Sequence, residues 1–276
     1  RILSETVAGL PLNVYKFKNA QDAKAKATLG KIAANELIIA GTGANDWLHS
    51  NGRAEPVDGG YRVTAHKHFV SGCPGAQVLV TSAITTTAAG DVVLHFSIPF
   101  ATAGVRILNN WDTLGMRGTG SQDVVLTDVL VPEDAIVARR PAGQWHAVWD
   151  LILPVAMPLI VSCYLGLAEQ AATLALQACK GKVESARDLG ALHNQLVLAR
   201  LSRNAMVEQC ADLRFKPGMA NTESILTCKT LATNAIQNVV ALAADLVGGS
   251  GFFKSHALER IQRHVHRLVA EVLVMH

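Results

Sequence analysis

The hydrophobic pattern of the chain changes twice, and these two changes limit the possible folds more than any other feature. Residues 1–35 have a helical pattern rich in alanine and lysine. Residues 36–140 contain short β-type runs separated by glycine, proline or asparagine, which predicts an antiparallel sheet. Residues 141–276 contain long segments with apolar residues at helical spacing, which predicts an antiparallel four-helix bundle. The expected class is therefore α+β, with a remnant of a helical domain, a β domain and a helical bundle in that order.

The composition is that of a globular protein with a sizeable core. Half of the 276 residues are apolar and 17% are charged, which excludes disorder as a description of the whole chain. The formal net charge is only +3, and no basic run exceeds Arg139-Arg140, so nucleic acid is not an expected partner. The five cysteines are scattered and form no Cys-x-x-Cys pair, which indicates reduced thiols and a cytoplasmic protein. Because the chain begins with Arg1, we expect it to be part of a longer protein.

An uncharged apolar run at residues 151–168 has about the length of a membrane-spanning helix. Pro154 and Pro158 interrupt the run near its start, and a charged segment with helical periodicity follows it. These features favour a buried core helix that begins near the prolines. We therefore expect no membrane span.

Two motifs in separate parts of the chain carry a resemblance to a known family. The first is WDTLGMRGTGS (residues 111–121), followed by DVVLTDVLVP (residues 123–132). The second is GGSG (residues 248–251), followed by LER (residues 258–260). They resemble the middle-domain and C-terminal signatures of acyl-CoA dehydrogenase-type flavoproteins. The resemblance covers about residues 36–263 and implies the family's fold: an N-terminal helical domain, a middle β domain and a C-terminal four-helix bundle.

The resemblance also implies an FAD cofactor, held between the β domain and the bundle of a homodimer or homotetramer. One segment of the family's middle domain lies along the flavin ring, and the Ser71 hydroxyl is expected to bond the flavin near its redox-active nitrogen. Glycines of the second motif would let the backbone approach the cofactor's pyrophosphate. The positions that match the family's flavin contacts are Phe69, Val70, Ser71, Thr42, Gly248, Gly249 and Gly251.

Each of these positions also has a purely structural interpretation. Phe69 has the pattern of an ordinary core residue of a strand. The glycines are typical of a helix C-cap, and this role is compatible with close approach to a cofactor.

Dehydrogenation of an acyl thioester at its CH–CH group is the activity that the resemblance implies first, with an electron-transfer partner as acceptor. This reaction requires a carboxylate base over the α-carbon. The two positions where family members carry that glutamate are Ser255 and Ser162 in this chain, and an unassisted serine cannot act as the base. His256 and Asp150 are possible substitutes, and the spacing selects neither.

A flavin-dependent monooxygenase of the same fold is the alternative. Such enzymes lack the glutamate, take reduced FMN or FAD from a separate reductase, and use molecular oxygen. Ser or His side chains often bond the oxygen or the substrate in such enzymes, and the residues available for this role are Ser71, Ser162, Ser255 and His256. A catalytically inactive member of the family is a third possibility. We expect no metal site, because His66 and His68 share a strand face but the sequence indicates no further ligands at suitable spacing.

Overall fold

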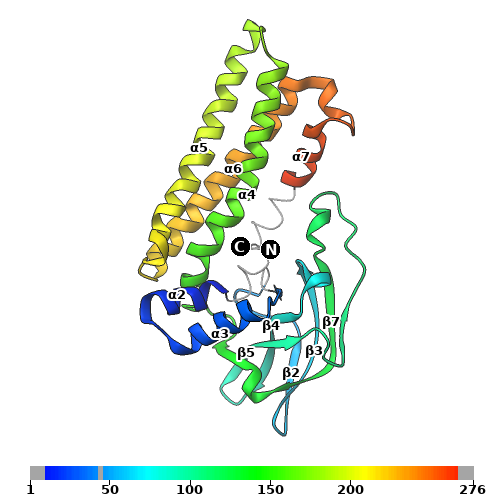
Figure 1. Ribbon diagram of the computed structural model, residues 1–276, viewed down its shortest axis with the longest axis vertical. Coiled ribbons are helices and arrows are strands. Elements are labelled where there is room, and N and C mark those ends of the chain that lie inside the picture. Colours follow the sequence, from blue (N-terminus) through cyan, green and yellow to red (C-terminus); the bar gives the residue numbers. More distant parts are fainter. Residues whose placement is uncertain (1–9, 43–45, 267–276) are drawn as a thin grey trace. The chain divides into compact units, whose positions relative to one another are not determined.

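The computed structural model describes residues 10–42 and 46–266 (Figure 1). The described chain forms two compact units. The first contains the residues up to 112 together with residues 117–152, and the second contains residues 113–116 and the residues from 153 onward.

The first unit begins with two helices and continues with one mixed sheet. The helices are α2 (Leu10–Ala20) and α3 (Ala23–Ala34), and the Asp22 carboxylate caps α3 by accepting a hydrogen bond from the Ala25 N–H at 2.9 Å. The strands are β1 (Ile39–Gly41), β2 (Arg53–Val57), β3 (Gly60–Val70), β4 (Val78–Thr87), β5 (Gly90–Pro99), β6 (Val105–Ile107), β7 (Gln122–Pro132) and β8 (Ile136–Pro141). They pair in the order β6-β7-β3-β2-β4-β5-β8, with β1 beside β4.

The prediction of a purely antiparallel sheet is wrong. Strand β1 pairs with β4 in parallel from Ile39 to Gly41, and β2 also meets β4 in parallel at Arg53 and Ile84. The Asp58-Gly59 sequence, which is typical of a hairpin turn, joins β2 and β3, and Gly59 has φ +77° there. The core of this unit is apolar and includes Val63, Leu79, Leu94, Phe96, Leu126 and Val131, each at most 1% exposed.

A buried polar network holds the loop of residues 46–51 against the sheet. Lys67 is 1% exposed, and its ammonium donates to Asp46 Oδ2 at 3.0 Å, to Ser50 Oγ at 2.9 Å and to the Asn51 carbonyl at 2.8 Å. All three ammonium donors are therefore used. Burial lowers the pKa of Lys67, while the Asp46 carboxylate opposes this shift.

Arg140 of β8 fixes the same loop from another side. Its guanidinium donates to the carbonyls of Asp46 and Leu48, and its Nε donates to His95 Nε2 at 3.0 Å. The guanidinium carbon lies 5.5 Å from the centre of the Trp149 ring, which is close enough for a cation–π contact. Arg140 can be buried because these acceptors and the Trp149 ring satisfy its guanidinium group.

The second unit contains the long helices that the sequence predicts. They are α4 (Trp149–Ala178, of which residues 149–152 belong to the first unit), α5 (Ala186–Cys210), α6 (Met219–Val247) and α7 (Ala257–His266). Pro154 and Pro158 lie in the first turns of α4, which remains one continuous helix. Hydrogen bonds join the helices: Arg200 Nε donates to Glu169 Oε1 at 2.8 Å, and Asn238 Nδ2 donates to Gln195 Oε1 at 3.2 Å.

Two helices of the described chain have the length and apolar composition of a membrane-spanning helix: Trp149–Ala178 and the continuous stretch Met219–Phe252. In α4, 56% of the most apolar window is buried inside the protein, as in the core helix of a bundle. A core helix passes the same test of length and composition, so the test by itself supports neither reading.

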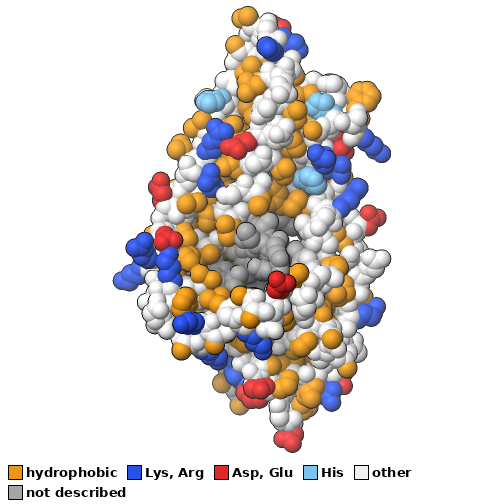
Figure 2. Space-filling view, viewed as in Figure 1, with side chains coloured by type: hydrophobic (Ala, Val, Ile, Leu, Met, Phe, Trp, Pro, Cys, Tyr) orange, Lys and Arg blue, Asp and Glu red, His pale blue; other side chains and the backbone are white. Residues whose placement is uncertain are grey.

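Charged side chains are dispersed over the face shown in Figure 2, and no continuous basic stripe is visible on that face.

Candidate functional site

A β-bulge at the end of β3 shapes the segment that the family resemblance places along the flavin. Lys67 pairs with Val124 of β7, whereas Val70 pairs with Gln122. Two residues of β3, His68 and Phe69, therefore lie opposite the single residue Asp123. Such a bulge bends the strand and re-aims side chains, and bulges are frequent beside active sites.

Phe69 adopts a backbone conformation that a bulky residue rarely takes. Its φ is +58°, in the left-handed region, and such conformations cluster at functional sites. The side chain is 46% exposed, so Phe69 is not the core residue that its strand pattern also allows. Its ring lies edge-on to Trp111 of the first motif, with the ring centres 6.1 Å apart. Val70 is fully buried in the core, so in this structure it offers no exposed surface to a ligand.

Ser71 stands at one end of a chain of hydroxyl groups. Its Oγ is 2.8 Å from Ser121 Oγ, which is in turn 2.7 Å from Thr119 Oγ1. Ser121 is 1% exposed, and the Gly72 N–H donates to the Thr119 carbonyl at 2.8 Å, so the two segments are joined. Because hydroxyl groups both donate and accept, the chain can reverse its direction. Ser71 can then offer a ligand either a proton or a lone pair.

Thr42 is fixed to the sheet rather than left on a loose loop. Its N–H donates to the Val80 carbonyl at 3.0 Å, and its hydroxyl is 2.7 Å from the hydroxyl of the buried Thr81. The next residue, Gly43, lies outside the described residues.

The three glycines of the second motif have three different environments in the second unit. Gly248 has φ +69° and ψ −154°, a combination that essentially only glycine adopts. A Cβ on Gly251 would lie 3.1 Å from side-chain atoms of Leu258 and Val247, so glycine permits close packing there. A Cβ on Gly249 would have no heavy atom of the described chain within 4 Å apart from its immediate neighbours.

A substitution at Gly249 can therefore distinguish a structural role of this turn from a role in binding. We expect Gly249→Val to leave the thermal unfolding of the single chain almost unchanged but to abolish flavin binding or association of subunits, because no described atom beyond the immediate neighbours lies within 4 Å of the new Cβ and the space there is open to a ligand or a second subunit. Gly190→Val is the matched control, since Gly190 on α5 is also open. Calorimetry, flavin titration and light scattering check this prediction, and a variant that binds flavin and assembles normally contradicts it.

The positions that replace the family's glutamate are occupied by groups with little capacity to act as a base. Ser162 Oγ donates to the Pro158 carbonyl at 2.6 Å within α4. Ser255 is exposed in the turn before α7. His256 Nδ1 accepts a hydrogen bond from the Leu258 N–H at 3.2 Å, which caps α7. Asp150, the acid considered as a substitute, accepts at Oδ1 from Trp145 Nε1 at 3.2 Å. Glu259, the acid nearest to Ser255 in the sequence, forms a two-pronged ion pair with Arg263 at 2.6 and 3.0 Å.

The two family motifs meet in the second unit. The Met116 N–H donates to His264 Nδ1 at 2.8 Å, and Arg263 Nη1 donates to the Leu114 carbonyl at 3.1 Å. The backbones approach so closely that a Cβ on Gly115 would lie 2.1 Å from the Arg263 carbonyl oxygen. Glycine is therefore required at this position of the first motif, and the sequence analysis missed His264 and Arg263 as its partners.

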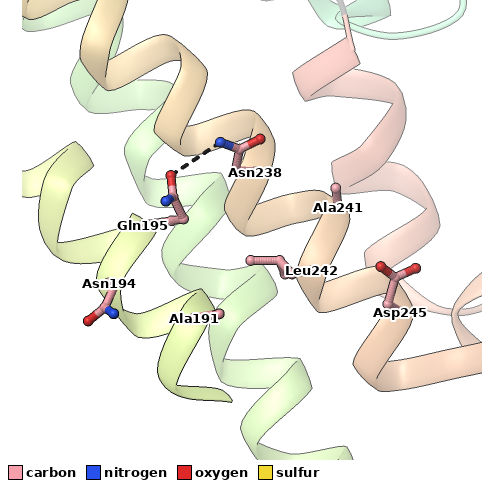
Figure 3. A pocket seen from close by; sticks show the side chains of 7 residues that line it. All are labelled: Ala191, Asn194, Gln195, Asn238, Ala241, Leu242 and Asp245. Atoms are coloured by element: carbon pink, nitrogen blue, oxygen red, sulfur yellow. Dashed lines mark hydrogen bonds between the residues drawn. The ribbon is translucent and has the colours of Figure 1, made fainter. Parts of the chain in front are cut away.

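An open groove between α5 and α6 holds none of the predicted site residues (Figure 3). Its lining residues are Ala191, Asn194, Gln195, Asn238, Ala241, Leu242 and Asp245. The lining is mostly small or amide side chains with one carboxylate, so it lacks the aromatic and apolar surface typical of cofactor sites.

Comparisons with known proteins agree with this architecture. Residues 152–269 match the family model of the acyl-CoA dehydrogenase C-terminal domain. Amino sugar nitrososynthase DnmZ of Streptomyces peucetius is 27% identical over 253 residues, which cover 87% of this chain and 62% of that protein. Dibenzothiophene monooxygenase of Rhodococcus erythropolis is 24% identical over 242 residues, which cover 77% of this chain and 58% of that protein. The chain thus spans about three fifths of the length of these curated relatives.

A solved structure matches almost the whole chain. KijD3, in complex with FMN and dTDP-3-amino-2,3,6-trideoxy-4-keto-3-methyl-D-glucose, covers 99% of this chain and 72% of its own, with a TM-score of 0.82 and 20% identity. The protein therefore has the acyl-CoA dehydrogenase-like α+β fold. Residues 152–269 thus match the C-terminal domain of the acyl-CoA dehydrogenase family, in agreement with the resemblance of the second motif, and the chain carries serine at the two positions where that resemblance places the catalytic glutamate.

Proposed function

We propose that the chain is the β domain and helical bundle of a flavin-dependent monooxygenase that oxidises a nitrogen or sulfur atom of a small molecule. In this reaction one atom of molecular oxygen enters the substrate and the other leaves as water. The two electrons come from reduced flavin. This proposal takes precedence over dehydrogenation of an acyl thioester, which the resemblance alone implied first.

The observation that carries the proposal is the identity of residues 162 and 255. Both are serine, and a hydroxyl group with its high pKa cannot remove the α-proton of a thioester. The Ser162 hydroxyl also already donates a hydrogen bond to a backbone carbonyl of its own helix. A monooxygenase needs no such carboxylate, because the substrate heteroatom itself supplies the electron pair that attacks oxygen.

The relatives support the same class of reaction. The nitrososynthase is named for an amino sugar and the monooxygenase for dibenzothiophene, which are a nitrogen and a sulfur compound. An amine or a sulfur heterocycle is therefore the substrate class that we propose for this chain.

A flavin is the cofactor that the site residues fit. Phe69 offers exposed aromatic surface near Ser71, with the half-buried Trp111 edge-on to it, and the hydroxyl chain behind Ser71 supplies a donor or an acceptor to the polar edge of a ring system. When bound, reduced flavin supplies the electrons for oxygen reduction. The cofactor of KijD3 is FMN, so we propose reduced FMN or FAD from a separate reductase.

The proposal also includes the association of subunits and the location of the protein in the cell. Phe252 and Phe253 are 87% and 67% exposed in the turn before α7, an unusual exposure for an adjacent aromatic pair. A homodimer or homotetramer would cover them. The cytoplasmic location expected from the cysteines belongs to this proposal as well.

Ser71→Ala tests the flavin assignment. We expect the variant to bind reduced FMN about 2- to 10-fold more weakly, because one hydrogen bond contributes about 0.5–1.5 kcal/mol. Thr173→Ala, which removes an exposed hydroxyl bonded only within α4, is the control. Anaerobic titration measures the affinity, and an affinity and reduction potential equal to those of the wild-type protein would remove Ser71 from the site.

The reaction class is tested with two assays on the full-length protein. In the first, reduced FMN is generated by NADH and a flavin reductase, and a primary amine or dibenzothiophene is added under air. In the second, oxidised FAD, butyryl-CoA and an artificial electron acceptor are supplied. We expect an oxygenated product in the first assay and no turnover in the second. Turnover of butyryl-CoA without an oxygenated product would overturn the proposal.

A further inference from the structure

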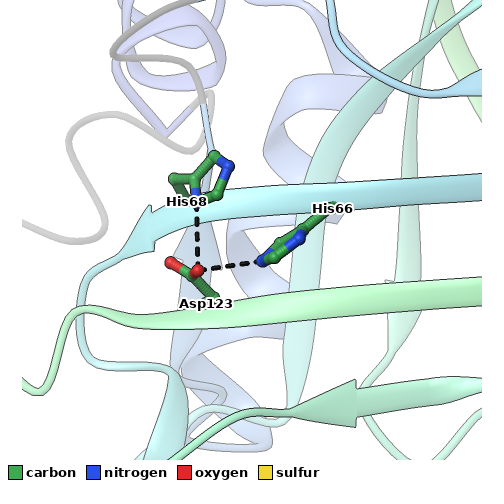
Figure 4. Close-up of side chains that lie close together, drawn as sticks. All are labelled: His66, His68 and Asp123. Atoms are coloured by element: carbon green, nitrogen blue, oxygen red, sulfur yellow. Dashed lines mark hydrogen bonds and ion pairs between the residues drawn. The ribbon is translucent and has the colours of Figure 1, made fainter. Parts of the chain in front are cut away.

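Two histidines and one carboxylate converge on the exposed face of the first unit. His66 Nε2 lies 2.9 Å from Asp123 Oδ2, and His68 Nδ1 lies 3.0 Å from the same oxygen. The three ligand atoms all lie within 4.8 Å of one another, and the two imidazole rings are 4.4 Å apart between centres. Figure 4 shows both rings turned toward the carboxylate.

The local backbone holds this cluster in place. His66 and His68 share a face because they are two residues apart on β3. At the bulge, Asp123 of β7 lies opposite His68 and Phe69. The Asp123 N–H donates to Asn110 Oδ1 at 3.0 Å, and Gln122 Oε1 accepts from the Asn110 N–H at 2.7 Å, so the loop before β7 is tied to the backbone of Asp123 and to the side chain of Gln122.

The carboxylate is available in its ionised form. Partial burial raises the pKa of Asp123, but hydrogen bonds from His66, Asn110 and His68 outweigh burial and hold the pKa below its ordinary value. An ionised carboxylate beside two imidazoles is a ligand set that zinc and related transition metals prefer.

We propose that His66, His68 and Asp123 form a binding site for one divalent transition-metal ion of the zinc class. Ligand atoms about 2.1 Å from a tetrahedral ion lie about 3.4 Å from one another. Small rotations of the side chains would therefore be enough to widen the two histidine–carboxylate distances so that the ion fits between the ligand atoms. The carboxylate can only accept, so in the metal-free protein both ring nitrogens carry the protons of these hydrogen bonds. In neutral imidazoles each proton moves to the other ring nitrogen when the ion binds. Three protein ligands leave the remaining coordination position to water.

The sequence does not indicate this site, because the third ligand is distant from the two histidines along the chain. Asp123 lies 55 residues from His68 and reaches it only through the pairing of β3 with β7. The site does not depend on the proposed monooxygenase activity.

Cobalt titration of the tag-free, chelator-treated protein tests the proposal. The visible bands of Co²⁺ report its coordination, and competition with Zn²⁺ gives the zinc affinity. We expect one equivalent per chain and a Zn²⁺ affinity at least about tenfold weaker in Asp123→Asn and in His66→Gln, the scale of effect seen even for groups that only orient ligands. His193→Gln removes an exposed histidine of α5 and is the control.

A second measurement on the wild-type protein guards against variants that fail to fold. Zn²⁺ is expected to protect His66 and His68, but not His193, from modification by diethyl pyrocarbonate, as read by mass spectrometry. Equal Zn²⁺ affinity in the wild-type, Asp123→Asn and His66→Gln proteins, or equal modification of His66 and His68 with and without Zn²⁺, would overturn the proposal.

Discussion

Lys67→Met is expected to lower the free energy of unfolding by about 3–5 kcal/mol, the usual result of removing one partner of a buried ion pair. Methionine fills a similar volume but leaves Asp46 buried without its cation, and Ser50 and the Asn51 carbonyl lose a donor. The loop of residues 46–51 follows Thr42 in the chain, and Thr42 lies directly after β1. We therefore also expect weaker flavin binding in this variant.

Chemical denaturation of three variants measures this effect. Asp46→Asn combined with Lys67→Met removes both charges, and we expect the double variant to be less destabilised than the sum of the single variants. Lys24→Met changes an exposed lysine of α3 and should shift the stability by no more than about 0.5 kcal/mol. A loss below about 1 kcal/mol in Lys67→Met would show that the ion pair contributes little to the fold.

His95 is expected to make stability depend on pH by about 2 kcal/mol between pH 7 and pH 5. Burial, followed by the nearby positive charge of Arg140, lowers the pKa of His95 to about 4. Arg140 Nε can only donate, so the nitrogen that it contacts, His95 Nε2, must be unprotonated. In the unfolded chain the same imidazole has a pKa of about 6.5.

The sign of this effect follows from proton binding. The unfolded chain takes up a proton as pH falls through 6.5, whereas the folded protein resists protonation until about pH 4. The contribution of His95 is therefore complete above pH 6.5 and is lost as pH falls toward 4. His95→Gln keeps an acceptor for Arg140 and should flatten the loss of stability between pH 7 and pH 5 by about 2 kcal/mol. An unchanged slope in denaturation experiments would contradict this role.

Local periodicity was sufficient to predict most helices and strands. The helical spacing of apolar residues predicts α5 and α6, and the Asp58-Gly59 turn predicts the hairpin of β2 and β3. The parallel pairing of β1 with β4 was not predictable, because pairing partners depend on long-range topology. Strand β8 was also missed, since Arg140 is a buried charge in a strand and only its distant partners explain it.

The candidate site was predictable only in part, and for a similar reason. The family resemblance predicts Ser71 and Phe69 as flavin contacts, and the structure places them beside Ser121 and Trp111 of the first motif. It does not reveal the Ser121 hydroxyl behind Ser71, because that contact arises where the start of β7 meets the end of β3. The bulge that brings Asp123 to His68 leaves no mark in the hydrophobic pattern.

Incorporation of isotopically labelled oxygen gas is the most direct test of the proposed monooxygenase. The full-length protein is supplied with reduced FMN, a primary amine or dibenzothiophene, and labelled oxygen, and the product is analysed by mass spectrometry. We expect one labelled oxygen atom on the nitrogen or sulfur of each product molecule after a single oxygenation. A product that carries only oxygen from water, or reduced flavin that is oxidised without any oxygenated product from either class of substrate, would contradict the proposed function.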